Sequence, residues 1–117
     1  VILKAIIVYH SEHHGNTLKV VSAIADKYNV QLVNVDQPKL VDFSKFDLIG
    51  VASGIYFGNF KQSLIDFVEQ KLPKSKNVFL IYTHGAQDNG DSDSIRRVLA
   101  KKGANIIGAF QCRGLDT

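Results

Sequence analysis

Short runs of β-branched and apolar residues alternate with helix-like stretches along the whole chain. The runs at 2–9, 47–52 and 78–82 are almost wholly apolar, which is typical of strands buried on both faces of a parallel sheet. Shorter runs at 30–35 and 105–110 complete a set of five expected strands. The 30–35 run alternates in polarity and indicates an edge strand. This alternation of strand and helix predicts an α/β fold with a parallel, doubly wound sheet.

Three helices are expected between the strands. Apolar residues recur at helical spacing over 17–28 and 93–102, and again in a stretch that follows residue 59. Asn59, with Gln62 three residues later, predicts an N-cap and capping box for the second helix. The third helix is expected to begin at a capping side chain, Asp91, Ser92 or Asp93. Gly103 is expected to end it.

The length of 117 residues predicts a single domain over 1–117. A helix after the 105–110 strand would cover the sheet face beside the first strand, and the chain shows no such helix. We therefore expect the chain to be C-terminally incomplete. The uncovered sheet face is then exposed or covered by a partner, and it is a candidate surface for a homo-oligomer.

Composition and charge exclude several classes of protein. Apolar residues make up 45% and charged residues 21%, as in globular proteins rather than disordered chains. No apolar run approaches the about 20 residues of a membrane-spanning helix. The net charge of +3 comes from dispersed Lys and Arg, which argues against a nucleic-acid partner. The single cysteine, Cys112, excludes an internal disulfide and is expected to be packed and inert. Together with the lack of a visible signal peptide, this predicts a cytoplasmic protein.

Three polar, glycine-containing loops follow the expected core strands, at 10–17, 53–59 and 83–93. In a doubly wound sheet, ligands bind at the carboxyl ends of the strands, where the strand order reverses. These loops are therefore the candidate binding site.

The first loop has the chemistry of a phosphate cradle. It leads directly into a helix, whose first N–H groups and partial positive charge favour an anion. An ordinary turn capped by Asn16 or Thr17 is the alternative. Adjacent histidines without a third ligand argue against a metal, so none is expected. The candidate residues are Ser11, His13, His14, Gly15, Asn16 and Thr17.

The second loop places two aromatic residues between glycines at the mouth of the sheet. Tyr56 or Phe57 is expected to stack on a flat heteroaromatic ring, and packing of both rings onto the core is the alternative. The candidate residues are Ser53, Gly54, Ile55, Tyr56, Phe57, Gly58 and Asn59.

The third loop begins with Thr83, His84 and Gly85, and its backbone N–H groups and Gln87 can bond the polar edge of a planar ring. No nucleophile, base and orienting acid occur as a set. Ser11 lacks the strand–elbow–helix setting of a hydrolase. We therefore expect no catalytic residue.

These motifs resemble those of the flavodoxin family. Ile-Val-Tyr-His-Ser-Glu-His-His-Gly-Asn-Thr at 7–17 resembles the flavodoxin phosphate loop. Ser-Gly-Ile-Tyr-Phe-Gly at 53–58 and Thr-His-Gly-Ala at 83–86 are similar to the two loops that flank the flavin. The resemblance covers nearly the whole chain. It implies a flavodoxin-like five-stranded sheet of order 2-1-3-4-5 and noncovalently bound FMN.

The resemblance also implies roles for the loops. The first loop would hold the phosphate, and the second and third would border the isoalloxazine, with the backbone near Gly58 as a candidate for a redox-linked hydrogen bond. It implies a redox protein that passes electrons to a partner protein, with a small FMN-dependent reductase as the enzyme alternative. A partner-binding module without turnover is a further alternative.

Two features differ from common flavodoxins. The first loop is one residue longer, with His13-His14 before Gly-Asn-Thr. The chain is basic, whereas electron-carrying flavodoxins are usually acidic.

Overall fold

The computed structural model describes residues 4–10, 16–36, 41–56, 59–84 and 92–113. Strands and helices alternate along the chain, with a short 3-10 turn, Phe43–Lys45, before β3. The strands are β1 (Ala5–His10), β2 (Gln31–Asn34), β3 (Leu48–Tyr56), β4 (Asn59–Phe60), β5 (Asn77–His84) and β6 (Asn105–Arg113). The helices are α1 (Asn16–Tyr28), α2 (Gln62–Lys71) and α3 (Asp93–Lys101).

Five strands form a parallel sheet in the order β2-β1-β3-β5-β6. This confirms the predicted order of the five long strands, and β2 lies at an edge as its alternating polarity indicates. The numbering differs because β4, a two-residue strand, pairs antiparallel with the end of β3. The chain moves one way from β1 to β2 and the other way from β3 to β6, which makes the sheet doubly wound.

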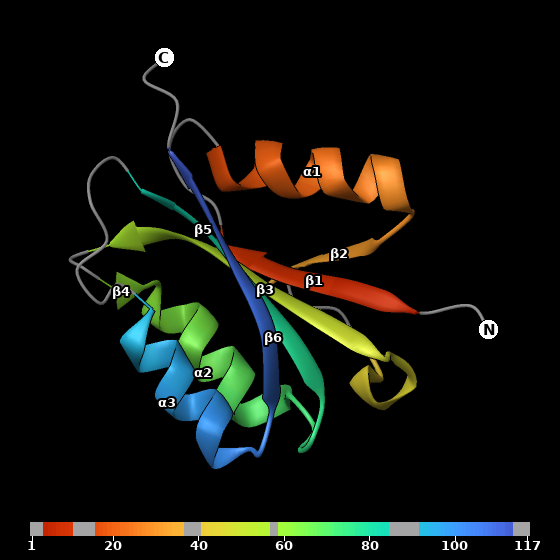
Figure 1. The fold of residues 1–117 in the computed structure, drawn as a ribbon, viewed down its shortest axis with the longest axis vertical. Helices are drawn as coiled ribbons and strands as arrows, with labels where there is room; N and C mark the ends of the chain where they lie inside the picture. The colour runs from red at the N-terminus through yellow and green to blue at the C-terminus, as the bar shows by residue number, and fades with distance from the viewer. Residues whose placement is uncertain (1–3, 11–15, 37–40, 57–58, 85–91, 114–117) are drawn as a thin grey trace.

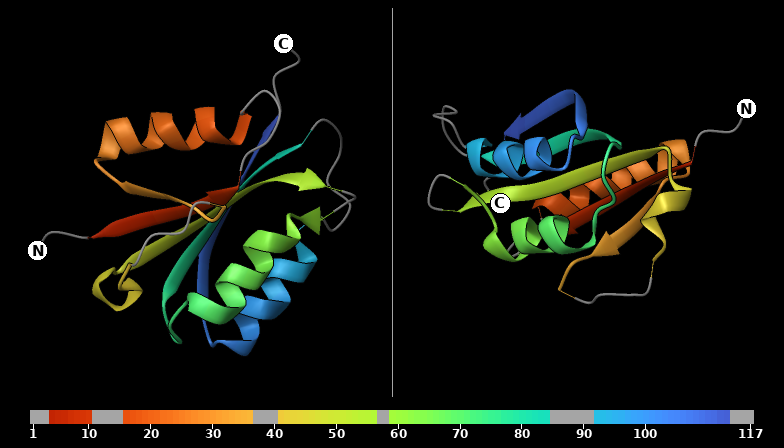
Figure 2. Two further views of the ribbon diagram at one scale, coloured as in Figure 1. Left: turned by 180° about the vertical axis from the view of Figure 1, so that it is seen from behind. Right: turned by 90° about the horizontal axis from the view of Figure 1, so that it is seen from below.

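The helices divide between the two faces of the sheet. On one face α1 packs against a cluster formed by Ile7, Val21, Ala52 and Ile81. On the other face α2 and α3 lie side by side, as both views show (Figures 1 and 2), and contribute Leu64, Val68, Ile95 and Leu99 to the larger core cluster. Right-handed crossovers produce this arrangement, because the chain reverses its direction across the sheet.

The start of α2 differs from the prediction. Asn59 lies in β4, where it pairs with Tyr56, so it does not cap the helix. The N-cap position is Lys61, which makes no side-chain capping bond. The Gln62 side chain donates to Asp66 Oδ1 at 2.9 Å instead of closing a capping box. The predicted loop 53–59 was therefore wrong in part, because strand pairing satisfies the backbone there.

The start of α3 also lacks the side-chain cap that the sequence predicts. Ser92 occupies the N-cap position and makes no side-chain capping bond. Its hydroxyl accepts a hydrogen bond from Arg96 Nε at 2.8 Å. At the other end, Gly103 has a φ of 65°, the left-handed conformation that ends helices, as its position predicts.

One 3-10 turn carries a conventional cap. The Asp42 carboxylate accepts from the Ser44 N–H at 3.1 Å and from the Ser44 hydroxyl. The bond from the Ser44 hydroxyl, and to a lesser extent the bond from its N–H, hold the pKa of Asp42 below its usual value. The turn lies at the amino end of β3, away from the candidate site.

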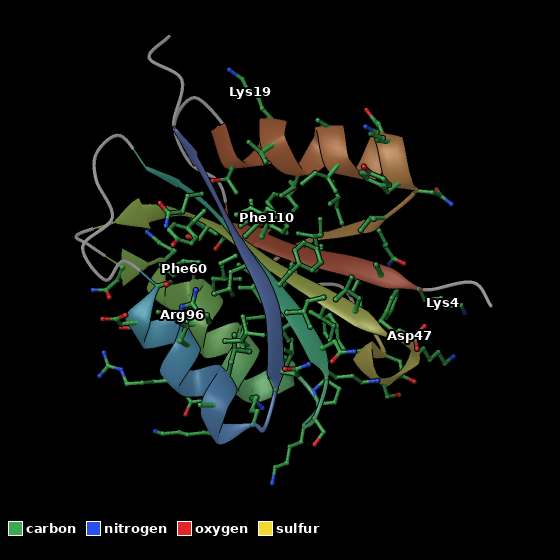
Figure 3. The ribbon with its side chains drawn as sticks, in the orientation of Figure 1. Lys4, Lys19, Asp47, Phe60, Arg96 and Phe110 are labelled. Carbon is green, nitrogen blue, oxygen red and sulfur yellow. The ribbon has the colours of Figure 1, made fainter. Side chains whose placement is uncertain are left out.

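Part of the α1 face of the sheet is open to solvent. Phe110, on the edge strand β6, is 59% exposed (Figure 3). Ile107, on the same strand, is 56% exposed. With Leu48, Phe79 and Gly108 they line an apolar hollow of about 260 Å³. An exposed part of the sheet face is therefore present, but on β5 and β6 rather than beside the first strand, where the sequence predicts it. No helix in the described part of the chain is long and apolar enough to cross a membrane.

Candidate functional site

The three strands that precede the candidate loops are neighbours in the sheet. β1, β3 and β5 lie side by side and run parallel, so their carboxyl ends reach the same edge (Figure 1). At that edge His10 pairs with Ser53, and Ser53 pairs with Tyr82. The strand order reverses between β1 and β3, which is where open α/β sheets bind ligands.

Several predicted site residues lie outside the described part of the chain, so their contacts stay predictions: Ser11, His13, His14, Gly15, Phe57, Gly58 and Gly85.

The first loop ends at the amino terminus of α1. Asn16 and Thr17 both lie in its first turn, and Thr17 is 2% exposed. No acidic residue occupies that turn. The helix end therefore keeps its full attraction for an anion, which fits a phosphate.

The second loop is built more tightly than a plain loop. Ser53 has no exposed surface; its hydroxyl donates to the Gly54 carbonyl at 2.5 Å and accepts from the Lys61 N–H at 3.1 Å. Asn59 is exposed, and its Oδ1 accepts from the Ser94 hydroxyl on α3 at 3.0 Å. Ser53 therefore joins β3 to the start of α2, and Asn59 joins the hairpin to α3.

The ends of β3 and β5 bring the second and third loops together. Gly54 pairs with Thr83, and Thr83 pairs in turn with Cys112 on β6. Ile55 and Tyr56 continue β3 to its end, and His84 is the last residue of β5. The backbone thus places both expected flavin-flanking segments at one edge. Stacking by Tyr56 stays a prediction.

Sequence reasoning missed a pair between a buried histidine and an exposed carboxylate at this edge. His10 is 4% exposed, and its Nδ1 lies 2.5 Å from Asp36 Oδ2. The sequence pattern predicts His10 in a loop and indicates no role for Asp36. A usable signal existed, because each residue directly follows a strand-like run and the two runs are expected to be neighbours.

A row of polar side chains crosses the sheet at the level of this pair. Register places His10 beside Ser53, Ser53 beside Tyr82, and Tyr82 beside Gln111. The Tyr82 hydroxyl accepts from Gln111 Nε2 at 2.8 Å. Strand alternation turns the first three toward the α2–α3 face, with the apolar cores beneath them. The row separates the core from the loops at the carboxyl edge.

Comparisons with known proteins agree with this architecture. Residues 6–115 match the family described as flavodoxin domain. An uncharacterised protein of Methanocaldococcus jannaschii is 36% identical over an alignment of 117 positions, which covers 98% of this chain and 78% of that protein.

Solved structures share the fold at lower identity. A Lactobacillus acidophilus flavoprotein in complex with FMN superimposes with a TM-score of 0.72 at 18% identity, covering 94% of this chain and 93% of the other. The two-electron reduced flavodoxin of Megasphaera elsdenii superimposes with a TM-score of 0.76 at 18% identity, covering 95% and 88%. The family match, the strand order and the edge at which the three candidate loops begin agree, and the chain belongs to the flavodoxin family.

Proposed function

We propose that this chain binds FMN noncovalently at the carboxyl edge of its sheet and works as a flavodoxin-like redox protein. The observation that carries the proposal is the register of β1, β3 and β5, which brings the three candidate loops to one edge. Membership of the flavodoxin family and the FMN-containing structural neighbour support the choice of ligand.

The phosphate would lie at the first loop and the first turn of α1, held by Ser11, Asn16, Thr17 and the helix N–H groups. His13 and His14 would add donors or positive charge to the same anion. The absence of acidic residues from the first turn of α1 fits this role.

The isoalloxazine would lie between the segments 53–59 and 83–85, with Tyr56 or Phe57 as the stacking ring. Bound FMN supplies the one- and two-electron redox chemistry. The protein's part is to bind the phosphate, orient the ring and limit the access of water.

We favour an electron carrier over an enzyme, because the sequence offers no nucleophile, base and orienting acid as a set. Its net charge of +3 favours a redox partner with an acidic docking surface. An FMN-dependent reductase is the enzyme alternative. The chain has a single cysteine and so no internal disulfide, which fits a reducing compartment, and we propose that the protein is cytoplasmic.

The exposed apolar hollow on β5 and β6 favours a second candidate, a module that binds a partner without turnover. The partner would be a second copy of this chain, because β6 is an edge strand with no charged residue before Arg113. Two copies that pack their open faces of β5 and β6 against each other about a two-fold axis would bury Phe110 and Ile107 of both copies. Size exclusion with light scattering would give a dimer mass that Phe110→Lys reduces to a monomer. A monomer in both samples would contradict this candidate.

The double variant Asn16→Ala/Thr17→Ala tests the FMN site. We expect FMN affinity, followed by quenching of flavin fluorescence, to fall about tenfold or more, because hydrogen bonds to a charged phosphate contribute about 1.5–3 kcal/mol each. Riboflavin, which has no phosphate, should bind the variant and the wild type alike.

Ser22→Ala, on the same helix beyond its first turn, is the matched control and should bind FMN as the wild type does. Unchanged FMN affinity in the double variant would contradict the proposal that the first turn of α1 binds the phosphate.

A further inference from the structure

Two neighbouring turns at the amino edge of the sheet gather lysines. The segment 71–76 ends α2 and leads into β5, and the segment 101–104 ends α3 and leads into β6. Because β5 and β6 are parallel, both turns lie at the end of the sheet opposite the candidate FMN edge (Figure 1). Neither segment contains an acidic residue. Their five lysines, which we call the lysine surface, are Lys71, Lys74, Lys76, Lys101 and Lys102.

Hydrogen bonds join the two turns into one surface. The Ser75 N–H donates to the Lys102 carbonyl at 3.0 Å, and the Asn105 N–H donates to the Lys76 carbonyl at 2.9 Å. The Lys102 ammonium group donates to the Leu72 carbonyl at 2.8 Å. Lysines that are dispersed in the sequence are therefore neighbours in the fold.

The backbone of the first turn is fixed as well. Ser75 has a φ of 64°, a left-handed conformation that residues other than glycine rarely adopt. Its N–H bond to the second turn holds it there. The Lys76 ammonium group donates to the carbonyls of Ser44 and Phe46 at 2.9 and 3.0 Å, which anchors the far end of the turn. Backbone conformations of this kind persist where surrounding bonds impose them, and they concentrate at functional positions.

The positive charge of the lysine surface is not cancelled by its surroundings. In the part of the chain that the structure describes, none of the five ammonium groups lies within 4.0 Å of a carboxylate. The carboxyl ends of α2 and α3 carry about half a negative charge each. The adjoining elements bring Asp42, Asp47 and Glu69. Asp42 already accepts from Ser44, and Asp47 accepts from the Lys4 N–H. A surplus of positive charge therefore remains at this edge.

The residue types select the kind of partner. Lys71, Lys74 and Lys101 are exposed, and their ammonium groups are strongly hydrated point charges. Neither turn carries an arginine or an aromatic residue, the types that dominate protein hot spots and that read or stack on bases. Lysines are also depleted from protein–protein interfaces. Clustered lysines without such anchors fit the diffuse negative charge of a bilayer that contains anionic lipids.

We propose that the lysine surface binds this protein peripherally to bilayers of anionic phospholipid. The contact is electrostatic, so it needs no membrane-spanning helix. It turns the amino edge of the sheet toward the lipid headgroups and leaves the carboxyl edge facing away from them (Figure 1). The lysine surface is separate from the proposed FMN site and does not depend on it.

Co-sedimentation with vesicles tests the proposal. One set of vesicles contains phosphatidylcholine with about 30% phosphatidylserine, and the other contains phosphatidylcholine alone. We expect the wild type to bind the anionic vesicles at least about tenfold more tightly than the neutral ones. Raising the ionic strength from about 0.01 M to about 0.15 M should weaken this binding, because salt screens charges at an exposed surface.

Two double variants locate the binding surface. Lys74→Gln/Lys101→Gln should weaken binding to the anionic vesicles about tenfold, because it removes two exposed charges from the lysine surface. Lys19→Gln/Lys27→Gln is the matched control. It removes the same charge from α1, on the other face of the sheet (Figure 3), and should bind as the wild type does. All four lysines are exposed, so both variants should fold, as thermal unfolding will show.

The outcomes are distinct. Failure of the wild type to bind the anionic vesicles, or equal binding to both kinds of vesicle, would overturn the proposal. Equal losses in the two double variants would also overturn it, because net charge alone would then account for binding. Tighter binding to a duplex oligonucleotide than to the anionic vesicles would replace the lipid partner with a nucleic acid. FMN titration of the same proteins reports on the proposed FMN site separately, and both variants should bind FMN as the wild type does.

Discussion

Gly50 lies in β3 at a point where the sheet leaves no room for a side chain. A Cβ placed there would lie 2.4 Å from Phe79 Cζ and 2.9 Å from Ile7 Cγ1. Both atoms belong to side chains on the α1 face of neighbouring strands, so the Phe79 ring packs against the bare backbone of β3. The absence of a side chain at Gly50 thus allows the Phe79 ring to approach the backbone of β3 closely.

Gly50→Ala should therefore destabilise the fold. We expect a loss of about 1–3 kcal/mol in the free energy of unfolding, because the methyl group must displace packed side chains. Thermal or urea unfolding measures it. Gly108→Ala is the matched control, since the Cβ there would meet Phe110 at 3.8 Å, an ordinary contact. Equal stability of the two variants would contradict this account of Gly50.

The His10–Asp36 pair, also at the residue scale, shows where sequence reasoning stops. The residue types and their positions after two strand-like runs are visible in the sequence. Their contact is not, because it depends on β1 and β2 being neighbours in register, with Val35 closing the ladder.

At the scale of elements, the passage from β3 through β4 to α2 is the segment that the sequence predicted least well. Its two-residue strand is too short to produce a pattern of alternating polarity. Lys61 at the N-cap has no capping side chain of its own. The Ser53 hydroxyl of β3 instead accepts a hydrogen bond from the Lys61 N–H, as a capping side chain does at other helices.

Ser53→Ala should loosen this passage. It leaves the Lys61 N–H without its acceptor, at a cost of about 1–3 kcal/mol in unfolding free energy. Hydrogen exchange at the amino end of α2 should also accelerate. Ser63→Ala is the control: the Ser63 hydroxyl is buried without a hydrogen-bond partner in the described part of the chain, so its removal should cost little. Equal losses in both variants would sink this role for Ser53.

At the scale of the whole molecule, the sequence predicted most of the architecture. The runs at 47–52 and 78–82 became the central strands β3 and β5, because strands covered by helices on both faces must be apolar on both. The reversal of strand order beside β1 followed from the same pattern and located the candidate site. The fine structure of the edge was less predictable, since the Ser53 bond depends on the short hairpin of β3 and β4, and the Asp36 bond joins residues on two different strand ends.

The central claim is that the carboxyl edge of this sheet binds FMN through its phosphate. The most direct test is titration of the purified chain into FMN and, separately, into riboflavin, following flavin fluorescence. The account predicts strong, saturable quenching of FMN and much weaker binding of riboflavin. Absence of quenching, or equal affinity for the two flavins, would contradict it.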